Sequence, residues 1–134
     1  MLCQRSTQIV IGELLAVCLA FGCFPDFFKS ASAIAFVDNM SVIHISVNGA
    51  ARHIDTGAFT LALHRRLAKL RVEVWWEYVP SQSNISDGGS RVGTACDMAA
   101  EANIPLRSIE FIMPPPSFPR SAPDEWDAWW HAPP

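Results

Sequence analysis

Three carboxylates occupy positions at which a charged group can do chemistry. Asp38 directly follows the apolar run 33–37, and Asp87 begins a helical segment that follows a second expected strand. Glu13 interrupts an apolar helical run, where an unpaired carboxylate is unfavourable unless a cation or a hydrogen-bond donor faces it. If the two strands are parallel neighbours, Asp38 and Asp87 lie at the same end of the sheet, close enough to share a divalent cation.

Each carboxylate also has a purely structural explanation. Asp38 can begin a turn, Asp87 can sit where the macrodipole favours an acid in the first turn of a helix, and Glu13 can lie on the solvated edge of its helix. Their order along the chain and their surroundings favour the interpretation that all three belong to one site.

The elements that must position these groups are read from hydrophobic periodicity. Apolar residues recur at three- and four-residue steps over 7–23, which predicts a helix closed by Pro25. The continuous apolar run 33–37 predicts a strand buried on both faces. A short helix is expected over 40–47, and the pair Asn48-Gly49 is its stop signal.

The second half of the pattern repeats this alternation of helix and strand. Asp55 or Thr56 is expected to cap a long amphipathic helix that ends at Leu70. Residues 71–79 alternate between apolar and polar and predict a strand, and a third helix is expected across 88–102. Two strands joined by a helical crossover are most simply parallel neighbours, so the sequence predicts an α/β fold.

Composition and charge exclude several classes of protein. Half of the 134 residues are hydrophobic, which is too many for a disordered chain. The net charge is -3, from ten Lys and Arg against thirteen Asp and Glu, so no global basic field attracts nucleic acid and any such binding is local. The four cysteines form no Cys-x-x-Cys pair, which argues against a zinc site or a disulfide framework.

The amino-terminal residues have the outline of a leader. Arg5 precedes an apolar run over 9–24, but Glu13 interrupts this run, which is also shorter than a membrane-spanning helix requires. We therefore expect an intracellular protein without a membrane segment. A small secreted protein with a cleaved leader is the alternative, and only then do the glycosylation sequons at Asn39 and Asn84 matter.

The last part of the chain differs from the rest. Residues 106–134 are rich in Pro and Trp and show no periodicity, whereas residues 5–105 carry all the expected elements. The sequence therefore predicts one partial domain over 5–105 and a disordered, solvated tail over 106–134. The run Pro114-Pro115-Pro116 can adopt a polyproline II conformation that docks on an aromatic groove.

Three sequence blocks resemble a known family. They are QIVIGELLAV at 8–17, FVDN at 36–39 and YVPSQSNISDGGSR at 78–91. In this order they look like the ribonuclease H-like domain of retroelement (reverse transcriptase) polyproteins, which shows a Glu in an ELLA helix, a strand that ends in DN, and a VPS..N..D..SR loop. The resemblance covers residues 8–92, and the third block is its most specific part.

The resemblance implies a two-metal nuclease that hydrolyses RNA in RNA/DNA hybrids. In that family carboxylates hold two Mg²⁺ ions around the scissile phosphate, with Mn²⁺ as a substitute. Because this chain lacks one of those carboxylates, we expect its metal binding to be weak or absent. The catalytic and metal-binding positions that it implies here are Glu13, Asp38 and Asp87. The positions that it implies for contact with the hybrid, or for bracing the loop that aims Asp87, are Asn39, Ser41, Asn84, Ser90 and Arg91.

The sequence also departs from the family pattern. The family's first catalytic Asp lies on a three-stranded segment that precedes the Glu-bearing helix, and here Met1 stands only a few residues before that helix. We therefore expect a ribonuclease H-like α/β fold without its first three strands and inactive as an isolated chain. Its origin is a degraded copy, a truncated gene model, or a piece cut from a longer polyprotein with a reverse transcriptase domain. The alternative is a non-catalytic module that binds nucleic acid or protein. The strand over 33–37 is expected to have an unpaired edge.

Overall fold

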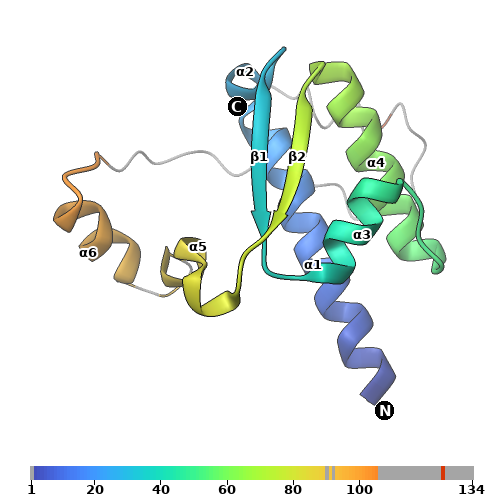
Figure 1. Ribbon diagram of the computed structural model, residues 1–134, viewed down its shortest axis with the longest axis horizontal. Coiled ribbons are helices and arrows are strands. Elements are labelled where there is room, and N and C mark those ends of the chain that lie inside the picture. The colour runs from blue at the N-terminus through green and yellow to red at the C-terminus, as the bar shows by residue number, and fades with distance from the viewer. Residues whose placement is uncertain (1, 90, 92, 106–124, 126–134) are drawn as a thin grey trace.

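The computed structural model describes residues 2–89, 91, 93–105 and 125 (Figure 1). It begins with α1 (Leu2–Cys23) and a single helical turn, α2 (Pro25–Phe28). The helix predicted over 7–23 is confirmed and starts earlier than expected. Pro25 lies in the first turn of α2, where a missing N–H is tolerated, so the long helix ends and a new direction begins at this residue.

Two parallel strands form the sheet. The strand β1 (Ser32–Val37) pairs with β2 (Glu73–Tyr78) in a register that sets Ser32 opposite Glu73 and Val37 opposite Tyr78. The two helices that connect the strands make the crossover (Figure 1). The predicted pair of adjacent parallel strands and the general α/β class are therefore confirmed.

The first crossover helix, α3 (Met40–Asn48), has well-defined ends. Gly49 follows it in the left-handed conformation, with φ of 66°, and donates its N–H to the carbonyl of Ile45. Glycine adopts this conformation without steric cost, which explains why the helix stops here.

The second crossover helix, α4 (Ile54–Leu70), begins slightly before its expected start. His53 occupies the N-cap position, although Asp55 or Thr56 was the expected cap. Both lie inside the first turn instead, and the Thr56 hydroxyl donates to the His53 carbonyl at 3.0 Å. The predicted helix is thus confirmed and its predicted cap is wrong.

The core lies between the helices and one face of the sheet. Its buried side chains come from α1, β1, α3 and α4, and from the residue before β2; they are Leu14, Cys18, Phe21, Val37, Val42, Phe59, Ala62, Leu63, Leu67, Leu70 and Val72. The Arg66 guanidinium is buried with them, and its Nε donates to the Phe21 carbonyl at 3.1 Å. This bond satisfies one of the carbonyls that the end of α1 leaves without a helical partner.

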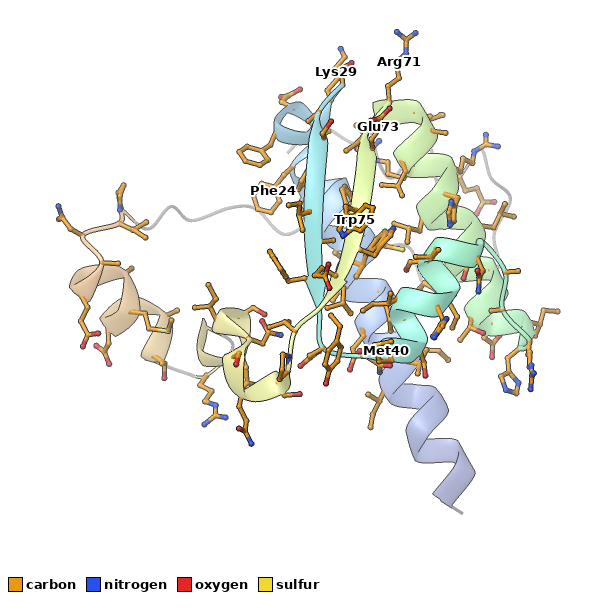
Figure 2. All side chains as sticks on the ribbon, viewed as in Figure 1. Phe24, Lys29, Met40, Arg71, Glu73 and Trp75 are labelled. Carbon is orange, nitrogen blue, oxygen red and sulfur yellow. The ribbon has the colours of Figure 1, made fainter. Side chains whose placement is uncertain are left out.

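The other face of the sheet is open. Ile34, Phe36 and Trp75 alternate with the inward-facing residues and expose 63%, 63% and 69% of their surface; we call these three residues the open sheet face. The prediction that the strand over 33–37 is buried on both faces is therefore wrong. The core residues of α1, α3 and α4 pack against one face only, so the apolar side chains of the second face stay uncovered within the described chain (Figure 2).

The helix predicted across 88–102 is divided. The structure has a short 3-10 turn, η1 (Ser81–Ser83), then α5 (Ile85–Gly89) and α6 (Thr94–Glu101). Gly93 separates the two helices with φ of 86°, a conformation that a helix interior does not contain.

Two further expectations concern the tail and the membrane. Apart from residue 125, the predicted tail over 106–134 lies outside the described residues. Among the helices that are described, none combines the length and the hydropathy that crossing a bilayer requires.

Candidate functional site

A two-residue connection places Asp38 at the carboxyl end of the sheet. β1 ends at Val37 and α3 begins at Met40, so only Asp38 and Asn39 lie between them. The side-chain Oδ1 of Asn39 accepts hydrogen bonds from the backbone N–H of Ser41 at 2.9 Å and of Val42 at 3.4 Å. This cap satisfies two donors of the first helical turn and thereby fixes the backbone next to Asp38.

Glu13 of α1 faces this connection. Burial raises the pKa of the Glu13 carboxyl most, a hydrogen bond from the Asn39 side chain lowers it, and the negative charge of Asp38 raises it further. Because Asn39 Oδ1 already caps α3, the donor to Glu13 must be the Asn39 amide nitrogen. Glu13 therefore lies close to Asn39 and Asp38.

The Glu13 carboxylate is incompletely satisfied. Its Oε2 atom is buried and has no hydrogen-bond partner among the described residues, while Asp38 places a second negative charge beside it. Two carboxylates in a partly buried place repel one another unless a proton or a cation lies between them. Carboxylate oxygens such as these are the ligand type that a hard divalent cation prefers.

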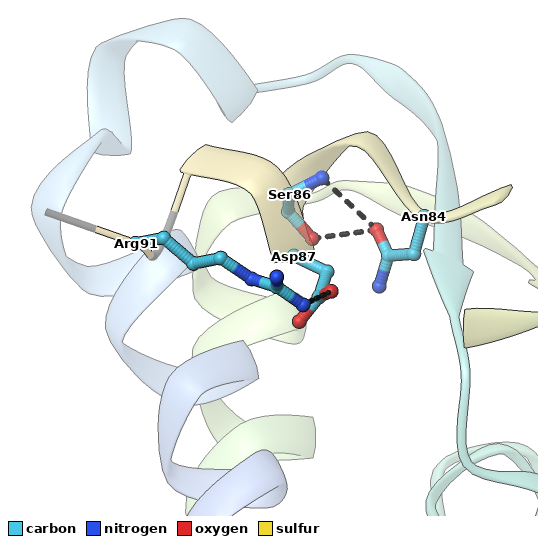
Figure 3. A network of polar contacts seen from close by, with 4 residues as sticks. All are labelled: Asn84, Ser86, Asp87 and Arg91. Atoms are coloured by element: carbon cyan, nitrogen blue, oxygen red, sulfur yellow. Dashed lines mark hydrogen bonds and ion pairs between the residues drawn. The ribbon is translucent and has the colours of Figure 1, made fainter. Parts of the chain in front are cut away.

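Asp87 lies in a different environment. It belongs to α5 and about half of its side chain is exposed, and its Oδ2 accepts from Arg91 Nη2 at 3.0 Å (Figure 3). Asn84 organises the start of this helix, because its Oδ1 accepts from the Ser86 N–H at 3.2 Å and from the Ser86 hydroxyl at 2.6 Å (Figure 3). Asn84 thus braces the loop that carries Asp87, and Arg91 neutralises the carboxylate of Asp87.

The described residues form a two-carboxylate site. Among them, no group of three or more His, Cys, Asp and Glu side chains is placed to hold a metal ion. Glu13 and Asp38 are brought together, whereas Asp87 is held by Arg91. The catalytic role of all three stays a prediction, and Ser90 lies outside the described residues.

An open cleft of about 400 Å³ borders the site. Val10, one helical turn from Glu13, and Ser41, next to the capped connection, form part of its lining. The remaining wall comes from α3, from the connection to α4 and from the first turn of α4; its polar side chains are His44, Asn48, Arg52, His53 and Thr56. Among the described residues that line this cleft there is no carboxylate, so its hydrogen-bond donors and its Arg52 charge favour an anionic ligand.

The sequence pattern does not predict this cleft. Asn48-Gly49 is the stop signal of a helix, and Arg52 and His53 follow it within a few residues. A basic residue beside a histidine just after a helix stop was the available signal. Its proximity to Glu13 depends on the packing of α1 against α3, which the local pattern does not contain.

The buried thiol is excluded as a nucleophile. Cys18 is fully buried, and burial raises the pKa of its thiol to about 12. A thiol with so high a pKa is almost entirely protonated at neutral pH and packs as a small apolar side chain.

Comparison with protein-family models, with curated proteins and with solved structures found no match. The assignment of this site therefore depends on the geometry of Glu13, Asp38 and Asn39, and on the resemblance of the three sequence blocks.

Proposed function

We propose that Glu13 and Asp38 form a ribonuclease H-like metal site that binds the backbone of an RNA/DNA hybrid. The observation that carries this proposal is the convergence of two carboxylates from separate elements, one of which keeps a buried oxygen without a partner. The ionised form of Glu13 is disfavoured here, because burial and then the charge of Asp38 both oppose it. A divalent cation between them removes that repulsion.

The donor set fits Mg²⁺, and Mn²⁺ as its substitute. Carboxylate oxygens are hard ligands, and Mg²⁺ retains several waters that a substrate phosphate can displace. Glu13 and Asp38 would hold the ion, which supplies positive charge next to a phosphate oxygen. The Asn39 amide nitrogen holds the Glu13 carboxylate in place, and Asn39 Oδ1 holds the first turn of α3.

The cleft beside the carboxylates extends the site toward an anionic strand. Its polar lining includes Arg52, His44 and His53, which can donate hydrogen bonds to phosphate oxygens. The overall charge of the chain is negative, so this local arrangement is the feature that favours a nucleic-acid backbone. We propose that the hybrid follows the cleft and presents a phosphate to Glu13 and Asp38.

The number of carboxylates favours binding over hydrolysis in this chain. A two-metal reaction needs two ions around one phosphate, and the described residues bring together two carboxylates. Asp87 forms an ion pair with Arg91. The second candidate function, a non-catalytic module that binds nucleic acid, is therefore supported by the same geometry. The rest of a polyprotein with a reverse transcriptase domain is the partner that could complete the reaction.

Hybrid binding and hybrid cleavage test the two functions separately. A fluorescent RNA/DNA hybrid is titrated with the full chain, with and without Mg²⁺, and the same samples are analysed for cleavage. We expect Mg²⁺-dependent binding that Asp38→Asn weakens at least tenfold, and no cleavage in Mg²⁺ or Mn²⁺. Glu101→Gln, which changes an exposed acid on α6, is the matched control and should bind normally.

Two results would decide against parts of this proposal. Binding that neither Mg²⁺ nor Asp38→Asn affects would remove the metal site. Robust cleavage by the unmodified chain, lost in Asp38→Asn, would show that a complete catalytic site forms and that the non-catalytic function is wrong.

A further inference from the structure

The open sheet face is a large apolar surface on a small sheet. Ile34 lies directly opposite Trp75 in the parallel register, and Phe36 follows on the same side of β1. The Trp75 indole Nε1 donates to Glu77 Oε2 at 3.1 Å, so the polar atom of the ring is satisfied within its own strand. What Trp75 offers to the outside is therefore its apolar ring, beside two further apolar side chains (Figure 2).

A two-stranded sheet with an uncovered apolar face is an incomplete structure. Sheets of this size are marginal in water unless further strands or helices cover their apolar sides. α1, α3 and α4 supply that cover on the inner face. A contiguous group of large exposed apolar residues on the outer face marks a contact surface.

We propose that residues 106–123 of this same chain, in place of the solvated tail expected from the sequence, fold back and cover the open sheet face. This segment begins directly after Pro105, where the continuous described part of the chain ends. Its large apolar side chains are Leu106, Ile109, Phe111, Ile112, Met113 and Phe118.

The segment is long enough to reach the sheet from any point on the domain. An extended chain spans about 3.3 Å per residue, so these 18 residues reach up to about 60 Å. A folded domain of about 100 residues has a radius of gyration of about 13 Å, so the path around it is shorter than this reach.

Charge selects this segment over the residues that follow it. Glu73 and Glu77 flank Trp75 on the outward side of β2. Residues 106–123 contain two arginines, at 107 and 120, against one acid, Glu110, whereas residues 124–134 contain three acids and no Lys or Arg. Two glutamates beside the apolar surface attract the first segment and repel the second.

Photocrosslinking in the full chain tests this contact directly. The photoreactive residue p-benzoylphenylalanine replaces Phe36, and illumination is followed by trypsin digestion and mass spectrometry. Because Phe36 is 63% exposed, the larger ring does not require repacking of the core. Trypsin cuts after Arg107 and Arg120, so the proposed contact appears as an intramolecular link to peptide 108–120.

Matched variants make the result specific. The same photoreactive residue at Leu61, an exposed position on α4, should give no link to peptide 108–120. Phe111→Ser should reduce the yield of the Phe36 link severalfold, and Trp126→Ser should leave it unchanged. Links to a second copy of the chain, links to residues 124–134, or no link to peptide 108–120 would each overturn the proposal.

Discussion

Glu13→Gln should stabilise the folded chain at neutral pH. The Glu13 carboxyl is partly buried beside Asp38, and both effects raise its pKa above the ordinary value of 4.5. The amide side chain has nearly the same shape and carries no charge. Its oxygen can still accept from Asn39, and its nitrogen can donate to the Asp38 carboxylate, which the wild-type carboxylate cannot do.

The sign and size of the stability difference between the two proteins follow from the difference in the Glu13 pKa between the folded and the unfolded chain. Below the ordinary pKa of 4.5, the carboxyl is protonated in the folded and the unfolded chain, and the two proteins should be similarly stable. As the pH rises, the unfolded chain loses this proton first and the folded chain later, so the wild type loses stability relative to the variant. Each unit by which the pKa is raised corresponds to about 1.4 kcal/mol, or roughly 4 to 6 °C in Tm for a domain of this size.

Thermal unfolding between pH 4 and pH 8 measures this difference. We expect the variant to gain stability over the wild type as the pH increases, while Glu101→Gln, at an exposed position on α6, follows the wild type throughout. Mg²⁺ at ten times its dissociation constant should stabilise the wild type by about 1.4 kcal/mol and the variant much less. Equal melting temperatures of wild type and Glu13→Gln at every pH, or a more stable wild type at pH 7, would refute the reasoning.

Five further substitutions test the fold around the site, each by chemical denaturation. Asn39→Ala should cost about 1 kcal/mol, since it removes the cap of α3, and a cost near zero would contradict the capping role. Leu14→Ala, at a fully buried position, should cost about 3 kcal/mol, against less than about 1 kcal/mol for Leu61→Ala at an exposed one. Gly49→Ala should destabilise by about 1 to 2 kcal/mol because of its positive φ, while Gly57→Ala, inside α4 with open space around it, should stabilise by up to about 1 kcal/mol. The same sign for both glycines would show that φ does not decide the outcome.

The order and type of the main elements could be predicted because each depends on a local pattern. The alternation of apolar and polar residues over 71–79 predicted β2, and the stop signal at Asn48-Gly49 predicted the observed end of α3. The burial of the outer strand face could not be predicted in this way, because a continuous apolar run does not show whether a second layer exists to cover it. Ile34 and Phe36 are apolar residue types that are typical of a core, but both are exposed.

The site was predictable only in part for a related reason. Glu13 in an apolar run and Asp38 after a strand both indicate a partner, and α1 does bring them together. Asp87 lies nine residues beyond the end of β2, and its position depends on the loop and on the i, i+4 ion pair with Arg91. Sheet topology fixes where a strand ends, but it does not fix the direction of a side chain at the end of a long loop.

The connection of two residues between β1 and α3 limits how this protein can vary in length. An inserted residue between Val37 and Met40 would rotate α3 by about 100° relative to the strand, or move Asn39 away from the first turn that it caps. Either change would separate Asp38 from Glu13. The connection between α3 and α4, over residues 49–53, carries no such constraint toward Glu13. We therefore expect insertions and deletions over 50–53 to change the cleft that Arg52 and His53 line while leaving Asp38 beside Glu13, and the spacing between strand and helix at Asp38 to be kept.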